Sequence, residues 1–174
     1  MKFEIIEVTP TSKIQFDERW CDDKTLFLFL AGTIEMGESE DWQKQFIEYL
    51  READFDPFIY YIHRIVVFNP RRAEGFDESV LSLENQIKWE LDHMMQAQYV
   101  IMNFLPNSKS PVSMLEFGLL IGSCPDKLHV ICPPEFYRYT NIKETYDMFY
   151  HDVVHKQMYH NMEQFKSVFF PGTV

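Results

Sequence analysis

Cysteine is scarce in this sequence: there are three, Cys21, Cys124 and Cys132, and their spacing matches no metal-binding motif. A small, odd number of cysteines excludes a disulfide-stapled scaffold and indicates reduced thiols. The sequence also lacks any uncharged apolar run of about 18 residues, the length expected of a membrane-spanning helix. The first residues do not show the basic and then apolar pattern of a secretory signal peptide. We therefore predict a cytoplasmic protein with no membrane partner.

Positive charge is scarce as well. The chain has 16 Lys and Arg against 27 Asp and Glu, a formal net charge of −11 at pH 7. Binding to nucleic acid polymers requires clustered cations that displace counterions, so this composition argues against such a partner. It does not argue against small nucleotides, because one cation or a helix N-terminus can hold a phosphate.

What the sequence does have is apolar material for a core. The 174 residues are 46% hydrophobic and 16% aromatic, which predicts a single domain over residues 1–174. Apolar or β-branched runs predict strands, and the segments between them have helical spacing; a weaker strand signal covers 2–8. The expected strands cover 25–32, 60–70, 99–106 and 127–134, and the expected helices follow within 33–53, 84–98 and 110–124. The alternation predicts an α/β fold: a mostly parallel five-stranded sheet, helices on both faces, and a helical C-terminal segment.

In such a sheet, ligands bind outside the carboxyl ends of the strands. The residues expected there include Gly32 and Thr33 after the first long strand, Arg71 and Arg72 in "NPRR", and Ser110. The first turn lacks the dinucleotide-binding G-x-G-x-x-G spacing. The two arginines are either a solvated pair or a site for a phosphate or an acidic side chain.

Glu116 is the one acidic residue in "SPVSMLEFGLL" (110–120). One interpretation is a capping box, with Ser113 as the N-cap and Glu116 reaching back to it. The alternative begins the helix at Ser110-Pro111, since Pro is favoured at the first helical position behind a Ser cap. In that register Glu116 lies in the second turn and is free for chemistry.

Two further motifs contain acids. In "WELDH", Glu90 and Asp92 are either solvated or, if one of them faces Glu116, the second acid of a two-carboxylate site. "HDVVH" (151–155) resembles the H-E-x-x-H zinc motif, with Asp152 in the Glu position. Because Asp152 shortens the general base and no third ligand is evident, we predict a helix surface there and no metal site.

Five stretches in the same order resemble the nucleoside 2-deoxyribosyltransferase family, including its relatives that hydrolyse 2′-deoxynucleoside 5′-monophosphates. They are "FLAGTIEMGESEDWQ", "FNPRR", "NQIKWELDH", "SPVSMLEFGLL" and "CPPEFYRYTNI", and together they extend over most of the chain. The resemblance implies a flavodoxin/Rossmann-like three-layer sandwich. It also implies a homo-oligomer with shared active sites and a small-molecule nucleoside or nucleotide substrate, with no cofactor.

The resemblance also implies roles for individual residues. Glu116 matches the family's nucleophile, and Glu90 matches the acid that handles the nucleobase, with Asp92 as second choice. Gly32 matches the sugar-side loop, with Thr33 beside it as a further substrate-binding candidate. Asn141 matches an Asn that a neighbouring subunit contributes.

The position six residues before the nucleophile separates the two branches of the family. The transferases have Asp there, whereas this chain has Ser110, as the monophosphate hydrolases do; an ionised Asp would repel a 5′-phosphate. Ser110, Ser113 and Arg71 are therefore further substrate-binding candidates, although the hydrolases' first-loop Arg is missing from the acidic loop here. We expect cleavage or transfer of an N-glycosidic bond through a covalent glycosyl-Glu116 intermediate. A monophosphate hydrolase, or a non-catalytic nucleotide-binding protein, remains open as an alternative.

Overall fold

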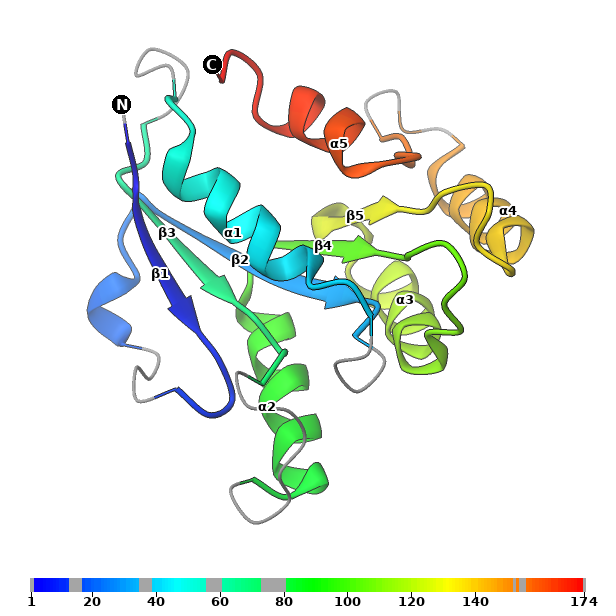
Figure 1. Ribbon diagram of the computed structural model, residues 1–174, viewed down its shortest axis with the longest axis horizontal. Coiled ribbons are helices and arrows are strands. Elements are labelled where there is room, and N and C mark those ends of the chain that lie inside the picture. Colours follow the sequence, from blue (N-terminus) through cyan, green and yellow to red (C-terminus); the bar gives the residue numbers. More distant parts are fainter. Residues whose placement is uncertain are drawn as a thin grey trace.

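The computed structural model describes residues 2–12, 17–34, 39–55, 61–72, 81–151, 153 and 156–173. Its centre is a five-stranded sheet in the order β1-β3-β2-β4-β5, and every neighbouring pair is parallel (Figure 1). The strands are β1 (Glu4–Val8), β2 (Thr25–Gly32), β3 (Arg64–Phe68), β4 (Tyr99–Asn103) and β5 (Leu128–Ile131). The predicted α/β class is confirmed, as is the edge strand near the N-terminus.

The order in which the strands are added to the sheet reverses at β2. From β2 the chain goes to β3 on one side and then to β4 on the other, where Gly32 is registered with Asn103. In doubly wound sheets the crevice at such a switch point, outside the carboxyl ends of the two strands, is where ligands bind. We therefore expect a ligand site next to the residues that follow β2 and β4.

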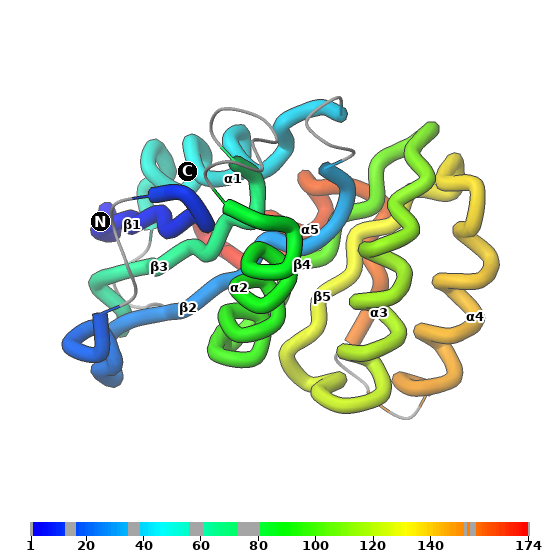
Figure 2. The backbone as a smooth tube through the Cα atoms, turned by 90° about the horizontal axis from the view of Figure 1, so that it is seen from below, coloured from blue at the N-terminus to red at the C-terminus, as the bar shows by residue number. Residues whose placement is uncertain are grey.

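Helices cover both faces of the sheet. Side chains of α1 (Trp42–Glu52) and α5 (Met162–Phe169) belong to the core cluster on one face. Those of α2 (Leu83–Gln96), α3 (Pro111–Ser123) and α4 (Tyr139–Tyr150) belong to the cluster on the other face. Figure 2 shows α1 on one side of the sheet and α2 and α3 on the opposite side. The short 3-10 helices η1 (Glu18–Trp20) and η3 (Pro125–Lys127) lie in connections.

The two faces explain why the strands are apolar throughout. On β4, Val100 and Met102 belong to the α2/α3 cluster, whereas Ile101 belongs to the α1/α5 cluster. A strand buried on both faces needs apolar side chains at successive positions rather than at alternate ones. Asn103 has the parity of Ile101, and is therefore a polar residue on the α1/α5 face.

The C-terminal third is less helical than its pattern predicts. After α4, Tyr159 pairs with Ile131 as a parallel bridge, and only then does α5 begin. The free edge of β5 explains the difference, because its backbone groups require a partner.

The prediction of a helix surface at residues 151–155 is wrong in part. Helix α4 ends at Tyr150, and Val153 is not helical; Asp152 and His155 lie outside the described residues. The Lys156 ammonium then donates to the carbonyls of Asp126 and Leu128, which turns the chain back toward β5. In the described parts of the chain, no group of three or more His, Cys, Asp or Glu could hold a metal ion. No helix there is long and apolar enough to cross a membrane.

Candidate active site

Three buried hydroxyl groups meet at the carboxyl end of β2. Thr33 Oγ1 lies 2.7 Å from Ser110 Oγ and 3.1 Å from Ser108 Oγ, and the two serine oxygens are 2.9 Å apart. The Leu105 amide donates to Thr33 Oγ1 at 3.0 Å. This hydroxyl cluster (Thr33, Ser108 and Ser110) ties the end of β2 to the loop that leads from β4 into α3.

Gly32 allows the close approach that makes the hydroxyl cluster possible. Its φ is +123°, and a Cβ added to it would lie 2.2 Å from the Asn103 carbonyl oxygen. Neither that backbone conformation nor that space is available to a larger residue. Gly32 is thus required for the packing of β2 against β4, which places Thr33.

Ser110 precedes α3 as predicted, but its side chain does not cap the helix. The helix begins at Pro111, and Ser110 makes no side-chain capping hydrogen bond. Its φ of 42° and ψ of 50° put it in the left-handed region, which is uncommon for a residue other than Gly. Ser110 is the N-cap residue, as predicted, but the predicted side-chain cap is wrong, because the Oγ atom is engaged in the hydroxyl cluster instead.

The start of α3 at Pro111 also decides between the two interpretations of Glu116. Ser113 is the third helical residue and is buried, so it is not an N-cap, and the capping-box interpretation is wrong. Glu116 lies in the second turn and is partly buried. Burial, and then the charge of Glu90, raise the pKa of Glu116 to about 8. At neutral pH this carboxyl group is largely protonated in the unliganded protein.

Glu90 lies on α2, close enough for its charge to act on Glu116. Burial raises the pKa of Glu90, while a hydrogen bond from Gln86 and the charge of Arg72 oppose that rise. Gln86 Nε2 donates to Glu90 Oε1 at 2.7 Å. Gln86 is not among the site residues predicted from the sequence, although its i, i+4 spacing from Glu90 on α2 indicates a shared helical face.

The structure does not bring Asp92 into this pair. Asp92 is exposed, and its charge raises the pKa of the neighbouring His93, against a larger lowering by burial. Two residues along a helix correspond to a rotation of about 200°, so Asp92 and Glu90 face different directions. Of the two acids in "WELDH", only Glu90 has an electrostatic interaction with Glu116.

Arg71 makes several protein contacts at the start of α1. Its guanidinium donates to Ser39 Oγ and the Glu40 carbonyl, both at 3.1 Å, and pairs with Asp41 at 3.3 Å. It also donates to Gln43 Oε1 at 3.3 Å. Arg71 thus fastens the segment before α1 to the end of β3, with donors that a phosphate would have to compete for.

Arg72 is the arginine nearer the carboxylates. It is buried, its Nη2 donates to the Leu81 carbonyl at 2.9 Å, and its charge lowers the pKa of Glu90. Of the two arginines, Arg71 was predicted to bind substrate, but it is Arg72 whose charge acts on one of the candidate acids. Only the packing of the segment after β3 distinguishes them.

Asn141 lies in the first turn of α4 and is exposed. No interaction in the described part of the chain joins it to Glu116 or Glu90. Its exposure leaves it accessible to a neighbouring molecule.

The two helices that carry the carboxylates also expose large apolar side chains. On α2 these recur at every fourth residue, and on α3 they recur at intervals of three and four residues around Glu116. They are Leu83, Ile87, Leu91 and Met95, which are 39 to 53% exposed, and Val112, Leu115 and Leu119, which are 46 to 74% exposed. We call these seven residues the α2–α3 apolar face.

A comparison with protein families finds a match to this chain. The family profile described as "Nucleoside 2-deoxyribosyltransferase like" matches residues 26–136, from β2 to the loop after β5. This range includes Gly32, the hydroxyl cluster, Glu90 and Glu116. No curated protein sequence matches the chain. The match extends over more than half of the chain, so this protein belongs to the nucleoside 2-deoxyribosyltransferase-like family.

Proposed function

We propose that the protein cleaves the N-glycosidic bond of (deoxy)nucleosides and transfers the sugar, with Glu116 as the nucleophile. The observation that carries the proposal is the electrostatic coupling of Glu116 to Glu90. They lie on adjacent helices of the family-matched region, near the switch point of the sheet. Two coupled carboxylates are the set of groups that retaining glycoside chemistry uses.

The raised pKa values are suited to this reaction. Two nearby carboxyl groups that both resist ionisation hold about one proton between them at neutral pH. The reaction needs the charge on Glu116 and the proton on Glu90, so the proton that Glu116 holds at neutral pH has to pass to Glu90 before the bond to C1′ forms. The Glu116 carboxylate forms a bond to C1′, while the acid form of Glu90 gives its proton to the departing base as the C1′–N bond breaks. An incoming base, or water, then releases the sugar from Glu116.

Gln86 is suited to hold Glu90 in both protonation states. Its amide nitrogen donates to the Glu90 carboxylate, and its buried Oε1 has no hydrogen-bond partner in the part of the chain that the structure describes. Rotation of the amide by about 180° would turn that oxygen toward a protonated Glu90 and let it accept the acid's hydrogen. Gln86 is thus a positioning residue for the proton donor.

Gly32, Thr33, Ser110 and Ser113 form the sugar side of the proposed site. The hydroxyl cluster can reorient its hydrogens, so that it can donate to or accept from a sugar hydroxyl. The same uncharged Ser110 at the start of α3 also tolerates a 5′-phosphate, which keeps the monophosphate N-hydrolase as the second candidate. Because Arg71 is occupied at α1, we favour the nucleoside.

We further propose that the α2–α3 apolar face is covered by another copy of the chain. Large apolar side chains that are exposed along the same helices are typical of an interaction site. Its residues flank Glu90 and Glu116 in sequence, so a partner seated there would shield the carboxylates from water. Asn141 of the neighbouring copy would complete the site.

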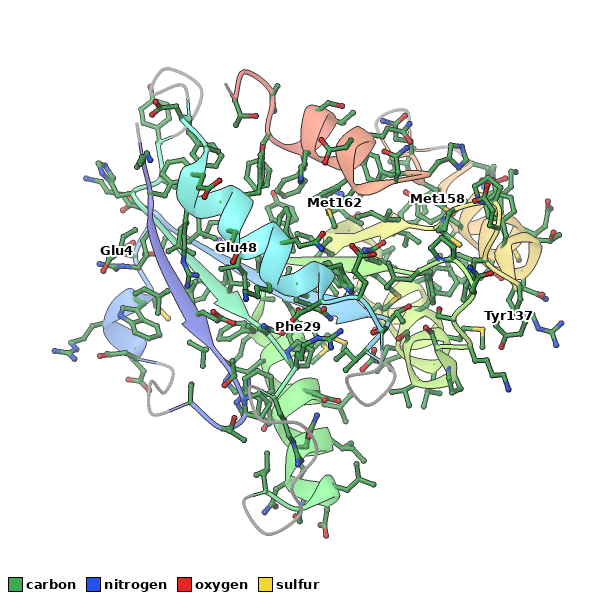
Figure 3. The ribbon with its side chains drawn as sticks, in the orientation of Figure 1. Glu4, Phe29, Glu48, Tyr137, Met158 and Met162 are labelled. Carbon is green, nitrogen blue, oxygen red and sulfur yellow. The ribbon has the colours of Figure 1, made fainter. Side chains whose placement is uncertain are left out.

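The test is base release from a panel of nucleosides and their 5′-monophosphates, followed by chromatography. The wild type should release base, and Glu116→Gln should lose at least about a thousandfold in rate, as removal of a nucleophile does. Glu48→Gln is the matched control, since Glu48 is exposed on α1 (Figure 3). A glycosyl adduct on the peptide that contains Glu116, seen by mass spectrometry after acid quench, would support the covalent step.

The outcomes separate the candidates. Sugar transfer that requires an acceptor base supports the transferase, whereas free phosphorylated sugar without an acceptor supports the hydrolase. Tight binding of a nucleotide with no base release would overturn both and identify a non-catalytic binding protein.

A further inference from the structure

A concave site lies on the α1/α5 face, across the sheet from Glu116 and Glu90. It is a cavity of about 220 Å³ between the ends of β4 and β5 and the first turns of α1 and α5. Its walls include Trp42, Phe46, Phe104, Ile131 and Met162. Figure 3 shows Met162 between α5 and the sheet.

Asn103 gives this cavity a polar group. Asn103 lines it and is 5% exposed, on the strand face that also carries Ile101. Its backbone carbonyl accepts from the Thr33 amide at 2.9 Å. Its carboxamide, by contrast, has no hydrogen bond in the described part of the chain. Its nitrogen and oxygen are also not among the described side-chain atoms that are both shut off from solvent and without a hydrogen bond. The amide therefore faces the cavity.

Most buried amides bond to other protein groups, and an amide without such a partner can bond only to water or to a ligand in the cavity. The neighbouring buried amide behaves differently. Gln43 accepts from Arg71 at 3.3 Å and donates to the Thr33 carbonyl at 3.5 Å. The contrast indicates that Asn103 keeps its donor and acceptor for something that enters the cavity.

The charged groups at the rim already have partners. Lys166 pairs with Glu163 at 2.8 Å and lies 4.5 Å from the centre of the Tyr49 ring. Glu40 accepts from Gln45 at 2.9 Å. With its charges paired or hydrogen-bonded, the rim offers little to select a strongly charged ligand.

We propose that this cavity, the Asn103 pocket, binds a small neutral planar molecule whose edge carries a hydrogen-bond donor beside an acceptor. Cyclic amides and amino-substituted heterocycles are the chemical class. An Asn carboxamide pairs with such an edge through two parallel hydrogen bonds, and the flanking aromatic rings supply apolar contact. The volume is below the roughly 300 to 1,000 Å³ of sites for drug-sized ligands, so the pocket fits one ring system.

The proposal does not rest on the function proposed above. The Asn103 pocket and the carboxylate pair lie on opposite faces of the sheet and share no side chain. A ligand in the pocket would nevertheless contact Asn103, whose backbone carbonyl accepts a hydrogen bond from the amide of Thr33. Thr33 is the residue that follows Gly32.

The test uses 2-pyridone and adenine as probes, with saturation-transfer NMR and calorimetry on the full chain. N-methyl-2-pyridone is the matched ligand, since it keeps the ring and the acceptor but has no N–H donor. Both probes should bind the wild type and Glu116→Gln equally, and N-methyl-2-pyridone should bind at least about tenfold more weakly than 2-pyridone. Asn103→Leu should weaken both probes by about tenfold or more, while Gln157→Leu, at an exposed amide, should change nothing.

Thermal unfolding separates a binding role from a structural one. Because Leu removes an unpaired buried amide, Asn103→Leu should unfold at the same or a higher temperature than the wild type. A lower unfolding temperature would show that the amide stabilises the fold, and would overturn the proposal. Equal affinity of the two pyridones, no binding of either probe at millimolar concentration, or loss of binding in Glu116→Gln would overturn it too.

Discussion

Thr33 Oγ1 and Ser110 Oγ are 2.7 Å apart, although 77 positions separate them in the sequence. Thr33 follows the central strand, β2. Ser110 has a left-handed backbone conformation and immediately precedes α3. The contact fixes where α3 begins relative to β2, and hence where Glu116 lies. The hydroxyl cluster therefore holds the left-handed backbone at Ser110 in place.

Thr33→Val tests the structural part of this role. Valine keeps the shape of threonine but leaves the Leu105 amide and the two serine hydroxyls without their shared partner. We expect the free energy of unfolding to fall by about 1–3 kcal/mol, measured by urea denaturation. Thr140→Val, at an exposed position on α4, is the control and should change little. Equal stability of Thr33→Val and wild type would contradict the role.

Ser110→Asp tests which substrate the site accepts. An aspartate there adds a negative charge beside the sugar's 5′ position, which repels a phosphate more than a hydroxyl. We expect the ratio of nucleoside to monophosphate turnover to rise by about tenfold or more, as measured with both substrates on one preparation. Because both substrates are measured on one preparation, a loss of folded protein lowers both rates equally and leaves their ratio unchanged. Ser110→Ala is the second control, since it removes the hydroxyl without adding a charge. An unchanged ratio would place the 5′ end elsewhere.

The pKa of Glu116 predicts a pH-dependent difference in stability between wild type and Glu116→Gln. The folded protein binds the Glu116 proton more tightly than the unfolded chain does, with a pKa of about 8 against a usual value of 4.5. Wild type should therefore lose stability relative to Glu116→Gln as pH rises from about 4.5 to 8, since the folded state holds more protons in that window. Urea unfolding midpoints across this range measure the difference. A difference that is constant with pH would show that Glu116 is not perturbed.

Gln86→Leu tests the positioning of the proton donor. Without the hydrogen bond from Gln86, the pKa of Glu90 should rise further, because that bond lowers it in the wild type. The alkaline limb of the activity profile, where Glu90 loses its proton, should move to higher pH, and kcat should fall by about 10- to 100-fold. Gln96→Leu, at the exposed end of α2, is the control. A lower kcat with an unmoved profile would indicate a packing role alone.

Leu115→Glu tests the proposed assembly. Leu115 is 74% exposed on α3, one residue from Glu116, so a charge there should disfavour burial against a second copy. We expect wild type to be oligomeric and Leu115→Glu to be monomeric in light scattering, with lower activity and an unchanged fold. Val168→Glu, at an exposed apolar residue on α5, is the matched control. A monomeric wild type would contradict the assembly.

Several elements could be predicted from the sequence because local rules govern them. The run at 25–32 is a strand at those residues, since continuous apolar side chains suit a strand that is buried on both faces. The helix that begins at Pro111 follows from the fixed φ of proline, and with it the second-turn position of Glu116. The structure of the C-terminal segment could not be predicted in this way. The strand-like pairing of Tyr159 depends on the open edge of β5, which no local sequence pattern indicates.

The fold class, the family and the three candidate acids could be predicted from the amino-acid sequence, because apolar periodicity and the order of motifs are properties of the linear chain. Only the tertiary structure decided how their surroundings act on them. The Ser110 hydroxyl bonds to Thr33 instead of capping α3, and the Arg71 guanidinium donates to the segment just before α1. The tertiary structure also separated Glu90 from Asp92. Burial, and contacts between residues far apart in the chain, set the hydrogen bonds and pKa values of these groups, and both exist only once the chain is packed.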